Sequence, residues 1–136
     1  MAQGEVDPGQ PTRKHIFCIN SSPEFLEFLR ELLQGEQYNV TTTNFVPRSF
    51  DQIVASRPDL LIVDLAYGQA VGWDLLAALE QEAITRHIPV IATSTDTALL
   101  ALAEKQRATY AADAYLVKPL VADELLAVVR ERIGPA

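Results

Sequence analysis

The sequence contains a single cysteine and no run of basic residues. Because Cys18 is alone, no disulfide bond can form within the chain, which excludes a small scaffold held together by disulfides. Lysine and arginine number 11 against 18 acidic residues, and the formal net charge of −7 argues against a nucleic-acid surface. The sequence has neither a signal peptide nor an apolar stretch near the ~18 residues that cross a bilayer. We therefore expect a cytoplasmic chain that binds neither nucleic acid nor membrane.

The chain has 136 residues, of which 49% are hydrophobic, enough for one domain with a sizeable core. Residues 1–13, MAQGEVDPGQPTR, combine two glycines and two prolines with no apolar period. We predict a flexible N-terminal tail over these residues and a single folded domain over residues 14–136.

Apolar runs and helix-period segments alternate along the domain. We predict strands over residues 15–19, 38–43, 60–63, 89–93 and 114–117. Helices are expected over residues 23–35, 72–86, 97–107 and 122–133, and a short helix capped by Ser49 should stop at Arg57–Pro58. Ser22 is expected to cap the first helix, with Pro23 at its first position and Gly35 at its end.

Five such strand–helix units predict an α/β fold with a doubly wound, five-stranded parallel sheet. The second strand is rich in threonine and should lie at an edge, whereas the third is a continuous apolar run, as expected for a strand covered on both faces. The predicted strand order is therefore 2-1-3-4-5, the flavodoxin-like (βα)5 arrangement, with two helices on one face and three on the other.

Polar residues follow four of the predicted strands. Asn20 and Ser21 follow the first strand, Asp64 the third, Ser94 the fourth and Lys118 the fifth. Because the carboxyl ends of parallel strands meet at one edge, where such sheets bind ligands, we expect these side chains to form a site.

Three segments at this edge resemble the receiver domains of response regulators, the CheY-like proteins of two-component signalling. "PDLLIVDLAYGQAVGWDLL" is similar to the third strand and following loop of that family, with Asp64 at the phosphoacceptor position. "IPVIATS" places Ser94 at the hydroxyl position, and "AADAYLVKPL" places Tyr115 at the switch aromatic and Lys118 at the lysine. The resemblance covers residues 14–133.

The resemblance implies that a histidine kinase transfers a phosphoryl group to Asp64. Ser94 and Lys118 would hold the phosphoryl oxygens, and the Lys118–Pro119 peptide bond would be cis. In the family, Mg²⁺ bridges the aspartate, the phosphoryl oxygens and a pair of acidic residues that follow the first strand. Tyr115 would act as the switch aromatic.

Asn20 and Ser21 occupy the positions of that acidic pair and bring no charge. Because Mg²⁺ prefers carboxylates, we expect no cofactor, or Mg²⁺ bound only weakly. Lys118 should then contact Asp64 directly or through one water, with Asn20 or Ser21 bonded to the same carboxylate.

Three functions remain open. The first is a pseudo-receiver, not an enzyme, which acts by contact with other signalling proteins, a histidine kinase or an output protein, with weak or no phosphorylation at Asp64. It could pair with itself through the fourth helix, fifth strand and fifth helix. The second is a working phosphoacceptor that takes the phosphoryl group with weak Mg²⁺ dependence. The third is a small flavodoxin-like enzyme, which the first strand–helix turn disfavours because "NSSPEF" has no glycine to wrap a phosphate.

Overall fold

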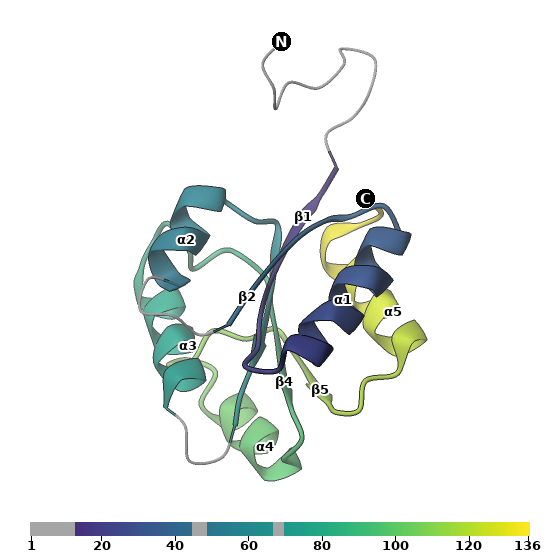
Figure 1. Cartoon of the computed structure of the whole chain (residues 1–136). Coiled ribbons are helices and arrows are strands. Elements are labelled where there is room, and N and C mark those ends of the chain that lie inside the picture. Colours follow the sequence, from purple (N-terminus) through teal and green to yellow (C-terminus); the bar gives the residue numbers. More distant parts are fainter. Residues whose placement is uncertain (1–12, 45–48, 67–69) are drawn as a thin grey trace.

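The computed structural model describes residues 13–44, 49–66 and 70–136, so the predicted N-terminal tail lies outside this part of the chain except for Arg13. Strands and helices alternate through the described ranges, as predicted (Figure 1). The strands are β1 (His15–Ile19), β2 (Asn39–Thr43), β3 (Leu60–Asp64), β4 (Val90–Ser94) and β5 (Ala114–Val117). The helices are α1 (Pro23–Gly35), α2 (Ser49–Ser56), α3 (Val71–Gln81), α4 (Thr97–Lys105) and α5 (Ala122–Ile133).

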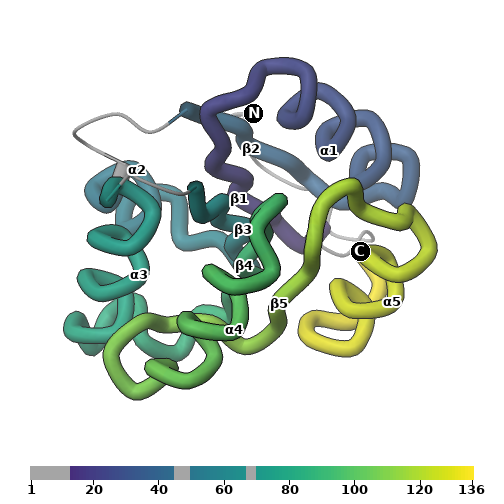
Figure 2. The backbone as a smooth tube through the Cα atoms, turned by 90° about the horizontal axis from the view of Figure 1, so that it is seen from below, coloured from purple at the N-terminus to yellow at the C-terminus, as the bar shows by residue number. Residues whose placement is uncertain are grey.

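The strands form one parallel sheet in the order β2-β1-β3-β4-β5, which confirms the predicted fold class and strand order. Figure 2 views the sheet end-on, with the strands in this order between two groups of helices. Because all five strands run the same way, their carboxyl ends share one edge. The residues that follow β1, β3, β4 and β5 are therefore brought together although they are far apart in sequence.

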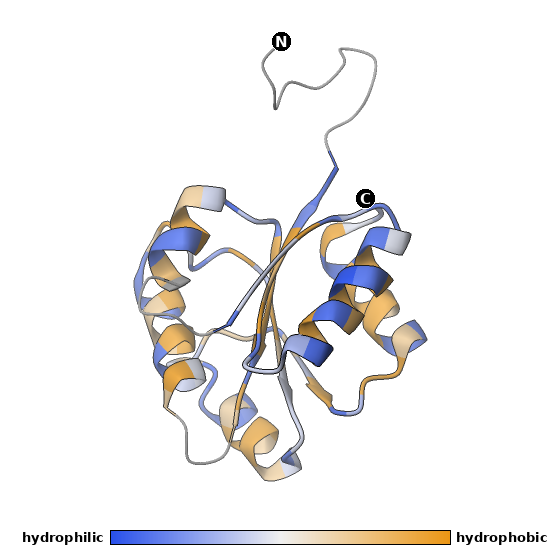
Figure 3. Cartoon of the chain, in the orientation of Figure 1, coloured by the Kyte–Doolittle hydropathy of each residue, from blue (hydrophilic) through white to orange (hydrophobic). Residues whose placement is uncertain are grey.

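The helices cover the sheet in two layers, two on one face and three on the other, as predicted. Helices α1 and α5 pack on one face, and α2, α3 and α4 lie on the other (Figure 1). Every residue of β3 and β4 is buried, because these central strands are covered on both faces. Figure 3 shows hydrophobic residues concentrated on the strands and the inward sides of the helices. The half-exposed β2 lies at the edge, where its threonines were expected to place it.

Helix α1 begins and ends as its sequence predicts. The Ser22 Oγ accepts a hydrogen bond of 3.2 Å from the Phe25 N–H, which makes Ser22 the N-cap, with Pro23 in the first turn. Gly35 is the last residue of the helix, as expected, and the left-handed residue is Gln37, with φ of 75°. The Gln37 N–H reaches the Gln34 carbonyl, so backbone hydrogen bonds close the helix without a left-handed glycine.

Two predicted helix ends were wrong in the same direction. Helix α3 ends at Gln81 instead of Arg86, and α4 ends at Lys105 instead of Arg107. The buried Thr85 donates its hydroxyl to the Leu79 carbonyl at 2.9 Å, and Arg86 Nε donates to the Glu80 carbonyl at 3.0 Å. These side chains satisfy the last carbonyls of α3 and thereby stabilise the helix end at Gln81, before the predicted one.

Helix α2 ends at Ser56, just before the predicted stop at Arg57–Pro58. Ser49, which was predicted to cap the helix, is its first residue. Arg57 has a left-handed φ of 49°, and its N–H donates to the Ile53 carbonyl. Across the described ranges, no helix has both the length and the apolar character required to cross a membrane.

Candidate functional site

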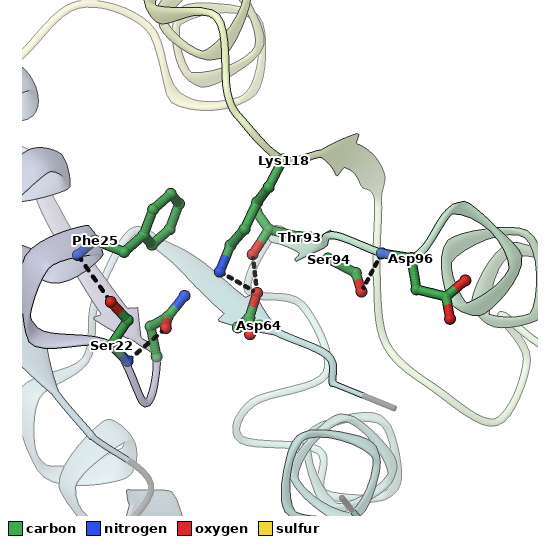
Figure 4. Close-up of polar contacts among 8 residues, drawn as sticks. Ser22, Phe25, Asp64, Thr93, Ser94, Asp96 and Lys118 are labelled. Carbon is green, nitrogen blue, oxygen red and sulfur yellow. Dashed lines mark hydrogen bonds and ion pairs between the residues drawn. The ribbon is translucent and has the colours of Figure 1, made fainter. Parts of the chain in front are cut away.

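The carboxyl edge of the sheet brings together Asn20, Asp64, Ser94 and Lys118. Asp64 is the last residue of β3 and Ser94 the last of β4, while Asn20 and Lys118 directly follow β1 and β5. Figure 4 shows Asp64 at the centre of this group, with Lys118 reaching it from the β5 side. The sheet topology alone explains why these four residues lie close together, since each of them ends or follows a parallel strand.

Lys118 and Asp64 form a direct ion pair. The Lys118 Nζ lies 2.8 Å from the Asp64 Oδ1, and their side chains are only 13% and 10% exposed. The direct contact expected from the sequence is therefore present. At an effective dielectric constant of about 20, the gross attraction at this distance is about 6 kcal/mol before the cost of desolvation.

Thr93 completes the environment of the same carboxylate oxygen. Its Oγ1 donates a hydrogen bond of 2.9 Å to the Asp64 Oδ1 (Figure 4). The parallel ladder between β3 and β4 pairs Asp64 with Thr93, and paired residues project to the same side of a sheet. One oxygen of Asp64 thus receives both a charged donor and a neutral donor.

Neither Asn20 nor Ser21 bonds to Asp64, so that part of the prediction was wrong. The buried Asn20 turns its Oδ1 toward the Ser22 N–H at 2.8 Å, and Ser21 is exposed. The start of α1 is the reason, because the turn before the helix leaves a backbone donor that an asparagine side chain satisfies well. Within the described part of the chain, the Asn20 Nδ2 has no hydrogen-bond partner.

An aromatic ring also lies against the Lys118 ammonium. The Lys118 Nζ is 4.0 Å from the centre of the Phe25 ring, well inside the range of a cation–π interaction. Phe25 lies in the first turn of α1, where the Ser22 cap holds its backbone. The ammonium group therefore contacts a carboxylate and an aromatic face (Figure 4).

Ser94 lies at the strand end but faces another partner. It is fully buried, and its Oγ accepts a hydrogen bond of 3.1 Å from the Asp96 N–H at the start of α4. Its carbonyl accepts a hydrogen bond of 2.8 Å from the Lys118 N–H, which ties β4 to the residue after β5. The Lys118–Pro119 peptide bond is cis, in agreement with the expectation from the resemblance.

Gly72 allows α3 to approach the backbone of Asp64. A Cβ atom at Gly72 would lie 2.5 Å from the Asp64 carbonyl oxygen and 3.0 Å from the Leu65 Cδ2. Real Cβ contacts are not that short, so a larger residue would push α3 away from the end of β3. The position of the Asp64 backbone thus depends on a glycine in the first turn of α3.

Tyr115, at the predicted switch position, is half-buried on β5. Its hydroxyl donates a hydrogen bond of 3.3 Å to the Ala112 carbonyl, and burial raises the pKa of the phenol above its ordinary value. This hydrogen bond ties the ring to the connection that precedes its own strand. A switching role for Tyr115 stays a prediction.

Sequence reasoning missed Thr93 and Phe25. Thr93 could not be found by aligning the ends of the third and fourth strands, because that alignment pairs Asp64 with Ser94, whereas the register of the sheet pairs it with Thr93. Phe25 carried no signal either. Its position at helical spacing fits core packing equally well, and only the three-dimensional approach of Lys118 shows its contact.

A doubly wound parallel sheet with an aspartate–lysine pair at its carboxyl edge defines a receiver-type α/β domain. The family model of the response regulator receiver domain matches residues 16–130. The chain therefore belongs to the response regulator receiver family, as its sequence motifs indicated. Receiver domains of two-component systems interact with kinases and output proteins in signalling.

Individual relatives agree with this assignment. The polar-differentiation response regulator DivK of Brucella anthropi is 23% identical over 124 residues, which cover 90% of this chain and 98% of the relative. The crystallised chemotaxis protein CheY4 of Vibrio cholerae has a TM-score of 0.78 at 18% identity, covering 89% of this chain and 99% of that one. The signal receiver domain of a signal transduction histidine kinase from Syntrophus aciditrophicus has a TM-score of 0.76 at 22% identity, covering 88% and 89%. At these identities the structural likeness establishes the fold.

Proposed function

We propose that this chain is a pseudo-receiver, a signalling module that keeps the receiver fold and works by protein contact, with weak or no phosphorylation at Asp64. It would not be an enzyme. The observation that carries the proposal is the direct Lys118–Asp64 ion pair beside two uncharged residues, Asn20 and Ser21. In this arrangement the chain itself neutralises the carboxylate that would accept the phosphoryl group.

The donor groups at the site are a poor match for Mg²⁺. This ion favours several oxygen ligands in octahedral geometry, with one or two carboxylates among them. Here Asp64 already accepts from Lys118 and Thr93, and the Asn20 Oδ1 already accepts from the Ser22 N–H. Among the described residues, no group of three His, Cys, Asp or Glu side chains could hold a metal ion. We therefore expect Mg²⁺ to bind weakly if at all.

Phosphorylation would also bring a second anion beside the ion pair. The attacking oxygen of Asp64 must form a bond to phosphorus while the bond from phosphorus to the leaving oxygen breaks. Catalysis of this transfer rests mainly on positioning and on neutralising the charge of the phosphoryl oxygens. Without a divalent ion, Lys118 would have to serve both its own carboxylate and the incoming anion.

Output by protein contact requires an accessible surface. Three of the large apolar side chains exposed in the described structure lie on α4, on β5 and just before α5: Leu102 at 42%, Val117 at 42% and Val121 at 61%. They lie on the surface of the fourth helix, fifth strand and fifth helix for which the sequence raised self-pairing. We propose that this apolar surface contacts a kinase, an output protein or a second copy of the chain.

A working phosphoacceptor remains the second candidate. It is favoured by the retention of Asp64, Ser94 and Lys118, all of which lie at the same edge. The Asn20 Nδ2, which has no hydrogen-bond partner among the described residues, could also donate to a phosphoryl oxygen. In that case Asn20 would contribute a neutral donor where other receivers use a metal ion.

Treatment with acetyl phosphate and Mg²⁺, followed by intact-mass measurement, separates the two candidates. The Asp64→Asn variant is the matched control, because it lacks the acceptor carboxylate. The pseudo-receiver proposal expects little or no phosphoryl adduct on the unmodified chain beyond that on the control. An adduct that forms readily, and that the control abolishes, would establish the working phosphoacceptor.

A further inference from the structure

Phe25 and Asp64 hold the same ammonium group by different means. The Lys118 Nζ lies 2.8 Å from the Asp64 Oδ1 and 4.0 Å from the centre of the Phe25 ring. An ammonium group has three protons, and the negative face of an aromatic ring attracts those that a single carboxylate oxygen leaves free. Both side chains of the ion pair are largely buried, which strengthens the attraction between the charges.

The local structure of α1 sets the position of the ring. The Ser22 Oγ accepts from the Phe25 N–H, so the first turn of the helix is held at its cap. Phe28, one turn further on, packs against Phe25 with ring centres 5.9 Å apart. Phe28 is 38% exposed, and the ion pair and the cation–π contact of Lys118 do not involve it.

A groove lies beside Phe25 and Lys118. Its volume is about 480 Å³, and its wall includes Phe28, Pro119 and Leu120 besides Phe25 and Lys118. The groove gives the Phe25 ring space to rotate away from the ammonium. A change of rotamer at one side chain could thus remove one of the two contacts that hold Lys118.

We propose that Phe25 is a positioning residue that holds Lys118 against Asp64, and that rotation of its ring into the groove releases the lysine. This role of Phe25 deepens the proposed function. It rests on that function for one consequence, that Asp64 stays paired with Lys118. It connects α1 to the Asp64 site without a metal ion or a phosphoryl group. Loss of the ring should leave the Lys118 amine more accessible to reagents in solution.

Competitive acylation measures this accessibility. Trace acetic anhydride would be added to the folded chain, and the labelling of Lys118 would be compared by peptide mass spectrometry with that of the exposed Lys105. Phe25→Leu keeps an apolar side chain but removes the ring, and Phe25→Tyr keeps the ring. Phe50→Leu, on α2 at the other face of the sheet, is the matched control. We expect the Lys118 to Lys105 ratio to rise about threefold or more in Phe25→Leu, a size typical of a cation–π contact. The ratio should stay at the unmodified value in Phe25→Tyr and Phe50→Leu.

Equal ratios in Phe25→Leu and the unmodified chain, or equal increases in Phe25→Leu and Phe50→Leu, would overturn the proposal. Thermal unfolding followed by Trp73 fluorescence shows whether each variant is folded. If Phe25→Leu does not fold, Phe25→Met replaces it and must meet the same expectation. The labelling uses no phosphodonor and no Mg²⁺, so its result does not depend on whether Asp64 accepts a phosphoryl group. The positioning role of Phe25 and the pseudo-receiver function can therefore fail independently of each other.

Discussion

The Lys118 ammonium lies 2.8 Å from the Asp64 carboxylate, and both side chains are almost entirely buried. Thr93 donates to the same carboxylate oxygen, whereas the nearby Asn20 and Ser21 bring no charge. A buried carboxylate needs a charged partner or a metal ion to offset its desolvation. In this chain the lysine supplies that partner.

Removing the lysine should therefore destabilise the fold. We expect Lys118→Met to lower the free energy of unfolding by about 2–3 kcal/mol, because Asp64 would stay buried with Thr93 as its donor. Urea unfolding followed by Trp73 fluorescence measures the change. Lys105→Met, at an exposed site, is the matched control and should change stability by less than about 0.5 kcal/mol.

The double variant Lys118→Met with Asp64→Asn tests the physical reason. Removing both charges should recover part of the loss, since no uncompensated carboxylate then remains. Additive effects of the two substitutions would show that the pair does not couple in solution.

Gly72→Ala should also destabilise the chain, against the usual preference of helices for alanine. The added Cβ would lie 2.5 Å from the Asp64 carbonyl oxygen, and such overpacking costs about 1–3 kcal/mol. Gly35→Ala in α1 is the control, because a Cβ there meets nothing within 4 Å and should stabilise by up to about 1 kcal/mol. A Gly72→Ala chain as stable as the unmodified one would show that α3 can shift without cost.

The fold could be predicted because its signals are local and repeated. The apolar run of β3 and the threonines of β2 placed these strands at the centre and the edge of the sheet. Helix ends were harder, since they depend on side chains that act after the apolar period has passed. Thr85 and Arg86 bond back to carbonyls of α3, and no periodicity predicts those contacts.

The single cysteine should make stability fall at high pH. Burial raises the pKa of the Cys18 thiol from 9.0 to about 12, so an unfolded chain releases this proton in a range where the folded chain retains it. The stability that the retained proton provides is present below pH 9 and is lost as pH rises toward 12. Burial also raises the pKa of Tyr38 and Tyr115, which remain in the control chain.

Cys18→Ala isolates this contribution. Urea unfolding at a series of alkaline pH values should show a steeper loss of stability in the unmodified chain than in the variant. Parallel curves for the two chains would mean that the thiol is accessible to solvent in the folded state.

The site could be predicted only as far as sequence position determines it. Strand ends placed Asn20, Asp64 and Lys118 at one edge, and charge counting then favoured the Lys118–Asp64 contact. The partner of Asn20 could not be predicted, because the choice between Asp64 and the Ser22 N–H depends on the geometry of one turn. The Phe25 contact required knowledge of how α1 packs against the residues after β5.

We propose that, with Asn20 and Ser21 at the positions of the acidic pair, Lys118 takes the place of a divalent ion. The most direct measurement is a Mg²⁺ titration that follows amide shifts around Asp64 in the unmodified chain and in the Asn20→Asp, Ser21→Asp double variant. We predict no saturable shift in the unmodified chain at sub-millimolar Mg²⁺, and saturable binding in the double variant, because three carboxylates can then compete with the lysine. Sub-millimolar binding by the unmodified chain, or no gain in the double variant, would contradict the account.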